Sequence, residues 1–598
     1  MRSTLDLAVI GNGSVAALVD KAGRIVWYCL PRFDGDPVFC ALLGNGLDRG
    51  YFDVELLDVA SVEQCYDENT AILVTTLTDR VGGRVRITDL IPRFKRFERI
   101  FRPRLLARRI EPLAGTPLVR IKLRPAFDYG AVEPIRTAGS NHLRFVGPET
   151  TIRLTTDAPL SCVEQESPFA LTGPMHLILG PDEPVEDGIQ HLWSMLHERT
   201  REYWVEWTRY LSIPFEYQEA IIRAAVTLKL CSFEDTGAIV AALTTSIPES
   251  PGSGRNWDYR YCWLRDAYFV VQALNRLGAT RTMEDHLRWI TTVVVMQGQN
   301  NLKPVYGILP DTSLAESLVT SLPGYRGDGP VRRGNEAYVQ HQHDTYGSVI
   351  LAAAQMFFDQ RLPQRGDVRL FGLLETLGEK AARYALEPDA GIWEFRGFAR
   401  VHTHSAVMCW AGCHRLAKIA GVLGLAARVQ HWRAEAERIR KAILERAWNA
   451  EMNSFTASFG GNDLDASLLL LHEVGFLAAS DPRFAGTVAA IERRLLKNGH
   501  LIRYDGADDF GHMEVSFIIC TFWYIDALAA MGRREEARAL FERLLERRNH
   551  AGLLAEDLDL ATGELWGNFP QAYSMVGIII SGMRLSKDWE EAFWRDAS

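Results

Sequence analysis

The sequence lacks three features that would each decide its class at once. It has no uninterrupted apolar run of about 20 residues, the length that a membrane-spanning helix needs. It has no block of Lys and Arg, and its formal net charge is −9, so nothing in it favours binding to nucleic acid. Its first residues contain no long apolar segment followed by a small-residue cleavage site. We therefore expect a cytoplasmic protein that binds neither membranes nor nucleic acid.

Cysteine is scarce and shows no pairing pattern. The chain has nine cysteines, an odd number spread along its length, and several lie in apolar runs, as Cys520 does. Cys409 and Cys413 are four residues apart, but the residues between them, including Trp410, are typical of a buried helix. We interpret the cysteines as reduced, buried thiols of a cytoplasmic protein.

No set of metal ligands stands out either. His341 and His343 form one closely spaced pair, and His402 and His404 form another. A metal site needs three or four converging ligands, and no further ligand is evident near either pair. We therefore expect no metal and no other cofactor. The two pairs are interpreted as hydrogen-bonding partners of nearby site residues or as substrate contacts.

The length of the chain and the change of pattern along it indicate two domains. With 598 residues, the chain exceeds the size of about 250–300 residues at which single cores stop growing. Short alternating β-type runs separated by Gly, Asp, Asn and Pro fill residues 1–184, which we assign to an antiparallel β-sandwich. Tryptophans among charged residues indicate a linker helix over 185–213. Residues 214–598 are assigned to a helical catalytic domain.

The second domain contains about a dozen amphipathic segments of ordinary helix length. No fixed repeat marks a solenoid, whereas a closed ring of helix pairs needs no sequence repeat. The predicted fold class is therefore β plus α, with an antiparallel β-sandwich followed by an (α/α)6 barrel of about twelve helices. The predicted helices are Glu216–Phe233, Trp263–Leu277, Thr282–Met296, Tyr346–Phe358, Arg369–Ala385, Ser405–Ala420, Leu425–Trp448, Ala466–Glu473, Phe484–Leu496, Val515–Met531, Glu535–Glu546 and Tyr573–Leu585.

The long loops of the helical domain mix aromatic and charged residues, as the segments 254–266, 322–335, 391–397 and 503–509 do. Sugars present hydroxyl groups along their edges and C–H groups on their faces. A sugar site therefore combines aromatic side chains with Arg, Asp and Glu partners. Because binding chemistry concentrates in such loops, they favour a pocket for a small saccharide.

Cleavage of a glycosidic bond needs one protonated and one ionised carboxyl group. Glu394 is the best candidate for the acid, because it follows Ile392 and Trp393 and an apolar neighbourhood raises the pKa of a carboxyl group. Glu556 is the best candidate for the base, since it follows the apolar segment 553–555. Among 75 acidic residues, these local arguments alone do not single out a pair.

Several motifs resemble one known family. In the same order along nearly the whole chain, they are similar to the glucoamylase family of glycoside hydrolases, family 15, and to its bacterial and archaeal glucoamylase- and trehalase-like branch. The motifs are Ile10-Gly-Asn-Gly-Ser-Val-Ala-Ala-Leu-Val, Cys29-Leu-Pro-Arg-Phe-Asp, Asn256-Trp-Asp-Tyr-Arg-Tyr-Cys-Trp-Leu-Arg-Asp-Ala, Gly324-Tyr-Arg-Gly-Asp-Gly-Pro-Val-Arg, Ile392-Trp-Glu, and Ala555-Glu-Asp with Gly567-Asn-Phe-Pro-Gln-Ala.

The resemblance implies an exo-acting, inverting α-glucoside hydrolase that releases glucose from a non-reducing end. Glu394 would be the general acid, and Glu556 the general base that activates water. Inversion implies that the two carboxyl groups lie about 6.5–9.5 Å apart with a water between them.

The resemblance also implies contacts with the substrate. Two neighbours, Arg265 and Asp266, would hold the 4- and 6-hydroxyls of the terminal glucose. Arg503, followed by Tyr504, would clamp another hydroxyl. The remaining implied contacts are Tyr325 and Arg326 near the leaving group and Trp257 and Trp393 as walls of the pocket. Taken singly, these residues also fit ordinary roles, such as a helix-start ion pair for Arg265 and Asp266 or loop packing for Tyr325. Asp258 and Glu564 are interpreted as structural.

The leaving group stays open at this point. Departures from the family pattern lie on its side of the site: Leu309-Pro310-Asp311, Ala406, and the histidines at 341 and 343. Trehalose and a maltooligosaccharide-like α-glucoside are both candidate substrates, with trehalose slightly favoured for an intracellular enzyme. The oligomeric state is also open, and a homo-oligomer is one alternative.

Two other functions are weighed against hydrolysis. A glycoside phosphorylase of similar architecture uses phosphate in place of water and the base, but Glu556 stands in its motif. A non-catalytic saccharide-binding protein would typically lose a catalytic carboxyl group, and here both are present. Hydrolysis is therefore the leading interpretation.

Overall fold

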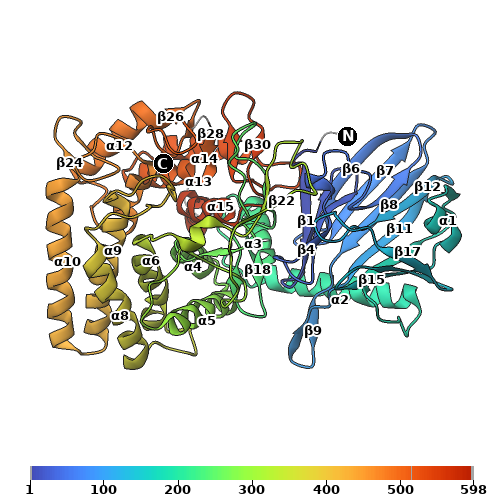
Figure 1. Ribbon diagram of the computed structural model, residues 1–598, viewed down its shortest axis with the longest axis horizontal. Coiled ribbons are helices and arrows are strands. Elements are labelled where there is room, and N and C mark those ends of the chain that lie inside the picture. The colour runs from blue at the N-terminus through green and yellow to red at the C-terminus, as the bar shows by residue number, and fades with distance from the viewer. Residues whose placement is uncertain (1–2, 513–514, 594–598) are drawn as a thin grey trace.

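The computed structural model describes residues 3–512 and 515–593. Strands occupy the N-terminal lobe of the molecule, and helices make up the lobe beside it (Figure 1). The helix α2 (Ile189–Arg209) lies between the two groups of elements along the chain. It buries Trp193, Leu196 and Trp204, which is the tryptophan pattern that predicted it. The domain boundaries at 184 and 213 stay predictions.

The N-terminal lobe consists mainly of two antiparallel sheets. In β12, for example, Val119, Ile121 and Leu123 are buried while the residues between them are more exposed, as expected when one face of a sheet packs on a core. The first sheet has the strand order β1-β2-β3-β5-β12-β16, with β4 paired to β3, and the second has the order β13-β14-β15-β17-β11-β8-β7-β6.

The strands of the first sheet are β1 (Leu7–Gly11), β2 (Ala16–Asp20), β3 (Ile25–Leu30), β4 (Asp36–Phe39), β5 (Tyr51–Leu56), β12 (Leu118–Arg124) and β16 (Phe169–Ala170). Those of the second are β6 (Val59–Tyr66), β7 (Leu73–Asp79), β8 (Arg84–Leu90), β11 (Leu106–Ala114), β13 (Ile135–Ala138), β14 (His142–Val146), β15 (Thr151–Thr156) and β17 (Met175–Pro181). A hairpin of β9 (Phe94–Arg96) and β10 (Arg99–Phe101) and the short helix α1 (Leu160–Gln165) complete the lobe.

The helical lobe is a closed double ring. Within the described residues, six inner segments contact one another in the cycle α4, α6, α9, η3 with α11, α13, α15 and back to α4. Inner helices are apolar on nearly all sides: every residue of α6 is buried, as are most residues of α13 and α15. The outer helices α3, α5, α8, α10, α12 and α14 pack behind them.

The inner segments are α4 (Ala267–Arg276), α6 (Asp344–Ala353), α9 (Thr403–Val422), η3 (Ala466–Leu469) with α11 (Leu470–Glu473), α13 (Ile518–Ala530) and α15 (Ala572–Leu585). The outer helices are α3 (Gln218–Leu230), α5 (Thr280–Gln297), α8 (Val368–Tyr384), α10 (Ala426–Arg446), α12 (Pro482–Leu495) and α14 (Arg534–Leu545), and the short helices α7 (Gln355–Phe358) and α16 (Trp589–Phe593) lie outside this scheme. Each of the twelve predicted segments overlaps one of the members of the ring, but Tyr346–Phe358 also takes in α7, and the first residues of Val515–Met531 form a strand, β28 (Val515–Phe517).

The β-lobe braces a loop of the helical lobe. Arg260, which is fully buried, forms an ion pair with the buried Asp258. Arg260 also donates hydrogen bonds to the Tyr129 hydroxyl (2.6 Å) and to the Gly35 carbonyl (2.9 Å) of the β-lobe. The interpretation of Asp258 as a structural residue agrees with these contacts. They anchor the loop that leads to Arg265.

No helix in the described part of the chain is both long enough and apolar enough to span a bilayer.

Candidate active site

The loops that enter the inner helices meet around one pocket with about 950 Å³ of open space. Most of its lining residues lie in the segments that precede α4, α6, α9, α13 and α15. Such loops can carry polar and aromatic side chains because the inner helices already supply the core. Seven of the ten predicted site residues line this pocket: Trp257, Arg265, Asp266, Trp393, Glu394, Arg503 and Tyr504.

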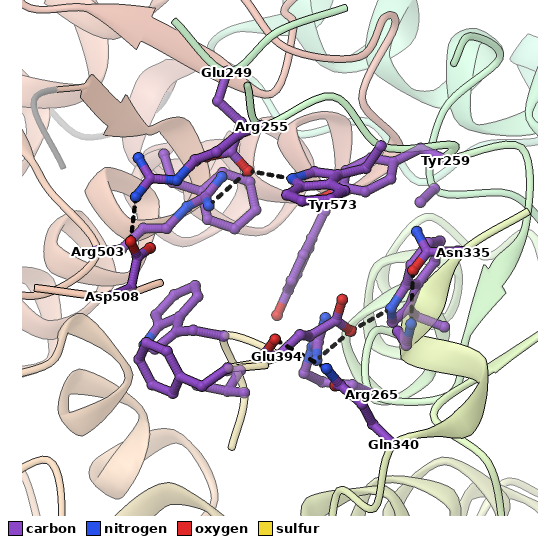
Figure 2. A pocket seen from close by; sticks show the side chains of 18 of the residues that line it. Glu249, Arg255, Tyr259, Arg265, Asn335, Gln340, Glu394, Arg503, Asp508 and Tyr573 are labelled. Atoms are coloured by element: carbon purple, nitrogen blue, oxygen red, sulfur yellow. Dashed lines mark hydrogen bonds and ion pairs between the residues drawn. The ribbon is translucent and has the colours of Figure 1, made fainter. Parts of the chain in front are cut away.

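Glu394 stands on one wall of the pocket (Figure 2). Its Oε1 accepts hydrogen bonds from Trp263 Nε1 (2.6 Å), Gln342 Nε2 (3.2 Å) and Arg265 Nη1 (3.5 Å). Its side chain is 22% exposed, and its φ of 61° is in the left-handed region that glutamate rarely adopts. Three side-chain donors thus reach one oxygen of this carboxylate, while Ile392 and Trp393 line the same pocket.

Arg265 and Asp266 lie beside Glu394 at the start of α4. Arg265 Nη1 donates to Gln342 Oε1 (3.1 Å), and its Nε lies 3.6 Å from Asp266 Oδ1. Burial raises the pKa of Asp266 to about 6, although the charge of Arg265 opposes this shift. These residues form an ion pair at a helix start and also line the pocket, so the two roles considered for them are compatible.

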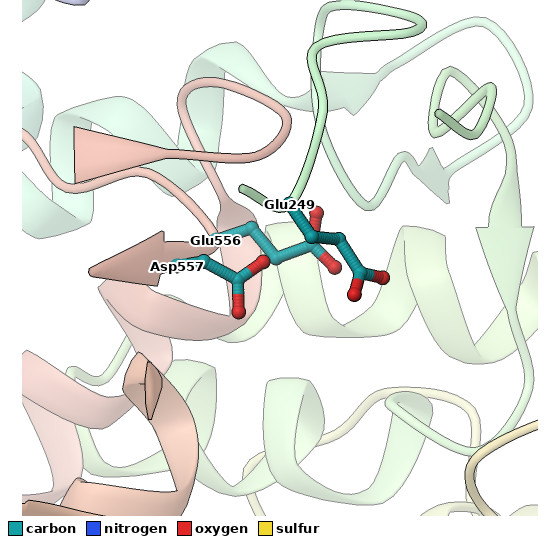
Figure 3. Close-up of side chains that lie close together, drawn as sticks. All are labelled: Glu249, Glu556 and Asp557. Carbon is teal, nitrogen blue, oxygen red and sulfur yellow. The ribbon is translucent and has the colours of Figure 1, made fainter. Parts of the chain in front are cut away.

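The opposite wall contains three buried carboxylates around one guanidinium group. Arg503 Nη1 donates to Glu249 Oε1 (3.0 Å), and its Nη2 donates to Glu556 Oε1 (3.1 Å). The same Nη2 lies 3.4 Å from both carboxylate oxygens of Asp557. Figure 2 shows Arg503 and Glu249 across the pocket from Glu394, and Figure 3 shows the three carboxylates together.

Glu556 lies directly behind the lining of the pocket. It is almost fully buried, and it precedes the strand β29 (Asp557–Asp559), which pairs with β28 (Val515–Phe517) and β30 (Leu565–Trp566). Its Oε2 accepts a hydrogen bond from the Asn568 N–H (3.2 Å). Gly567 makes room for it, because a Cβ at that position would lie 2.8 Å from Glu556 Oε2. The backbone N–H of Gly567 is bonded to the Pro248 carbonyl (2.8 Å), next to Glu249.

The charges on this wall shift one another. Burial raises the pKa of Glu556, the charge of Glu249 raises it further, and Arg503 opposes both. Burial likewise raises the pKa of Asp557 well above its usual value. Burial alone would lower the pKa of Arg503, but the three carboxylates raise it well above its ordinary range. The guanidinium group therefore stays charged, and its positive charge offsets the cost of burying three carboxylates.

The same wall is the one place in the described residues where potential metal ligands converge. Oxygen atoms of Glu249, Glu556 and Asp557 lie within 4.8 Å of one another. Arg503 contacts all three, so a side-chain cation already compensates their charge.

The two histidine pairs lie apart from this convergence. His343 stacks on Tyr384, and His402 stacks on Phe395, the neighbour of Glu394. Burial lowers the pKa of both histidines to about 4, which favours their neutral form. The packing of His402 beside the Glu394 loop is consistent with a supporting role in the site.

The other predicted wall residues are held by hydrogen bonds to carboxylates. Trp257 Nε1 donates to Glu249 Oε1 (3.0 Å), and Trp393 Nε1 donates to Asp465 Oδ2 (2.6 Å). The Tyr504 hydroxyl donates to Asp508 Oδ2 (2.6 Å). These bonds fix the orientation of the aromatic rings before any sugar arrives.

Two predicted residues, Tyr325 and Arg326, are not part of the pocket lining. The structure therefore corrects the prediction that they lie at the leaving group. Tyr325 is fully buried and packs edge-on against Trp566. Arg326 has a left-handed φ of 57°, which turns its side chain toward Glu564 (2.5 Å) and the Ser3 carbonyl (2.6 Å). The loop supports the site indirectly, because Asn256 Nδ2 donates to the carbonyl oxygen of its Asp328 (2.9 Å).

Sequence reasoning missed several lining residues. Trp263 stands in the same motif as Arg265, so its role could have been suspected. Glu249 sits in the loop Ile247-Pro-Glu-Ser-Pro, which carries no local signal of its partners. Its place beside Arg503 depends on contacts between segments far apart in sequence.

Comparisons with known proteins agree with this architecture. The family model for glycosyl hydrolases family 15 matches residues 216–583, and the model for the trehalase-like N-terminal domain matches residues 4–160. The chain is 33% identical to a trehalase of Thermoplasma volcanium, over 98% of this chain and 94% of that protein. It is 32% identical to a trehalase of Mycobacterium tuberculosis, over 98% and 90% respectively. A bacterial glucoamylase complexed with acarbose superposes with a TM-score of 0.68 at 13% identity, over 96% of this chain and 93% of that structure. The predicted fold class is confirmed.

Proposed function

We propose, because the chain belongs to family 15 of the glycosyl hydrolases, that it hydrolyses trehalose to two molecules of glucose with inversion at the attacked carbon. The observation that carries the proposal is the pair of carboxylate-bearing walls that face each other across one pocket (Figure 2). The identity to trehalases over nearly the full chain, β-lobe included, favours trehalose over longer glucosides.

Glu394 is proposed as the general acid. All three donors reach its Oε1, so that oxygen accepts hydrogen bonds and the proton belongs on Oε2. Oε2 can then deliver the proton to the glycosidic oxygen as the bond to C1 breaks.

Glu556 is proposed as the general base. As the C1–oxygen bond of the substrate breaks, the oxygen of a water bonds to C1 from the opposite face, and one proton of that water passes to Glu556. The leaving glucose keeps the bonding electrons and takes the proton of Glu394. The base must be ionised to act, and the contact with Arg503 favours its ionised form.

The remaining lining residues are proposed to recognise one glucose ring. Arg265 and Asp266, which line the pocket, are proposed to exchange hydrogen bonds with hydroxyls near Glu394, and Arg503 is proposed to donate to a hydroxyl on the other wall. Trp257 and Trp393 supply apolar faces for the ring.

The test is glucose release from equal concentrations of trehalose, maltose and maltotriose in phosphate-free buffer. We expect release from trehalose at least tenfold faster than from either maltose-type substrate. Faster release from the maltose series would replace trehalose by a 1,4-linked glucoside. Formation of glucose 1-phosphate only after phosphate is added would identify a phosphorylase and contradict the proposal.

Proton NMR of the first products tests the stereochemistry. Inversion of trehalose gives one β-glucose from the attacked ring and one α-glucose from the leaving ring, so the two anomers should appear in equal amounts before mutarotation. A retaining enzyme would release α-glucose alone.

A further inference from the structure

We propose that Glu249 is a third catalytic carboxylate, which holds the attacking water together with Glu556. This inference rests on the proposed function, since it assigns a role within hydrolysis. It concerns a residue that neither its local sequence nor its neighbours in the chain single out.

Glu249 is the carboxylate of its wall that reaches the pocket. Glu249 is among the residues that line the cavity and Glu556 is not, although both side chains are almost fully buried, at 2% and 1% exposed. Arg503 links the two carboxylates, with one guanidinium nitrogen on each. A water in contact with Glu556 from the pocket side therefore lies beside Glu249 as well (Figure 3).

The two oxygens of Glu249 differ in a way that suits this task. Oε1 accepts hydrogen bonds from Trp257 Nε1 and Arg503 Nη1, both at 3.0 Å, and these bonds fix the carboxylate. Oε2 is buried and accepts no hydrogen bond from the described residues; it forms only a long ion pair with Arg255 Nε, at 4.0 Å. A buried carboxylate oxygen without a donor is costly, so the site favours a ligand that supplies one.

The position of Glu249 points to water as that ligand, and not to the leaving glucose. In an inverting reaction the leaving group departs toward the acid and the water attacks from the opposite face. Glu249 stands beside the base and across the pocket from Glu394 (Figure 2). It is therefore on the face from which water comes.

A divided role for the two carboxylates follows. The water oxygen bonds to C1, and one water proton passes to Glu556. The other proton stays on the new hydroxyl group and is hydrogen-bonded to Glu249 Oε2, which keeps a lone pair of the water directed at C1. Glu249 takes up no proton in this step.

The experiment uses two substrates, trehalose and α-glucosyl fluoride. The fluoride has no leaving sugar and needs no acid, but it still needs an oriented water. Glu249→Gln keeps the shape and the acceptor for Trp257 and Arg503 but places an amide donor where Oε2 accepts. Glu375→Gln is the matched control, because Glu375 is also buried and accepts from a tryptophan (Trp432, 2.8 Å) and pairs with an arginine (Arg428, 3.5 Å) far from the pocket.

We expect Glu249→Gln to lower kcat about 10²-fold on both substrates, while Glu375→Gln stays within about twofold of the wild-type protein. A fall on trehalose alone would assign Glu249 to the leaving glucose and overturn the inference. Unchanged rates on both substrates would overturn it as well. If the wild-type protein hydrolyses the fluoride but not trehalose, only the choice of trehalose fails; if it hydrolyses neither, the proposed hydrolysis fails and this inference with it.

A second variant separates a role in catalysis from a merely structural one. Glu249→Ala removes the carboxylate and leaves space beside Glu556. Azide is a small anion that needs no deprotonation, so it should attack C1 from this space, displace fluoride and form β-glucosyl azide. We expect azide to speed consumption of α-glucosyl fluoride by this variant at least tenfold, with no effect on Glu375→Ala. No azide product from a folded Glu249→Ala protein would contradict a role on the water side.

Discussion

The two walls of the pocket handle negative charge in opposite ways. On one wall Glu394 is partly exposed, has Asp266 beside it, and receives three hydrogen-bond donors on one oxygen. On the other wall three carboxylates are buried and share one arginine. The first arrangement gathers three donors on one oxygen of a carboxylate, and the second has more acceptors than its arginine can satisfy.

This difference explains how two glutamates can do opposite work in one pocket. A carboxylate with one saturated oxygen presents its other oxygen as the proton carrier. A wall with excess acceptors attracts the protons of a water and orients its oxygen toward the sugar. Both walls use a glutamate, and the surroundings of each glutamate set its role.

The largest effect is expected when the shared cation is removed. Arg503→Met leaves three buried carboxylates without their partner, so we expect the free energy of unfolding to fall by about 3–5 kcal/mol and kcat to fall at least about 10³-fold. Chemical denaturation and trehalose hydrolysis measure the two effects.

Arg108→Met is the matched control for this variant. Arg108 pairs with Asp89 in the β-lobe, and both side chains are fully buried. This variant should lose similar stability but keep the turnover of its folded fraction. Equal losses of turnover in both variants would show that Arg503 is needed only for folding.

A smaller effect is expected when the position of the base is disturbed. A Cβ at Gly567 would lie 2.6 Å from Glu556 Cβ and 2.8 Å from its Oε2, so Gly567→Ala should displace the carboxylate and lower kcat by about 10–10²-fold. Gly532→Ala is the control: its φ of 83° is similar to the 75° of Gly567, but no atom lies within 4 Å of its added Cβ. Both variants should lose about 1–2 kcal/mol of stability from the left-handed backbone, and only Gly567→Ala should lose turnover.

The pH profile should report on the wall of the base. The base must be ionised, so activity falls as the pH drops through the pKa of Glu556. Because burial and Glu249 raise that pKa, the acidic limb of kcat/KM should lie above about 4.3, the ordinary value for a glutamate. An acidic limb at or below that value would contradict the assignment of Glu556 as the base.

The smallest predicted effect concerns the wall of the acid alone. Trp263→Phe removes a donor that orients the carboxyl group of Glu394, so kcat on trehalose should fall by up to about tenfold. The rate on α-glucosyl fluoride, which needs no acid, should stay unchanged. An equal fall on both substrates would mean that Trp263 acts on the other wall.

Much of the fold could be predicted from local patterns, because each helix of the ring carries its own apolar face. The ten-residue helix α6 is buried on all sides, and its apolar composition is visible in the sequence. The linker helix was predicted for the same reason, since Trp193, Leu196 and Trp204 recur at helical spacing.

The site was less predictable because its residues meet through tertiary contacts. The motif residue Arg265 was identified, yet the hydrogen bonds that surround Glu394 come from two separate segments, 263–265 and 342. Arg326 was misjudged because a left-handed turn directs its side chain to Glu564. Glu249 was missed because only the fold brings it to Arg503.

The most direct measurement compares Glu394→Gln and Glu556→Gln on trehalose and α-glucosyl fluoride. If one wall supplies the proton and the other the water, Glu394→Gln should lose about 10²–10⁴-fold on trehalose yet stay within about tenfold of the wild-type protein on the fluoride. Glu556→Gln should lose about 10²–10⁴-fold on both substrates. The opposite pattern, with Glu556→Gln spared on the fluoride and Glu394→Gln slow on both, would contradict the assignment of the two walls.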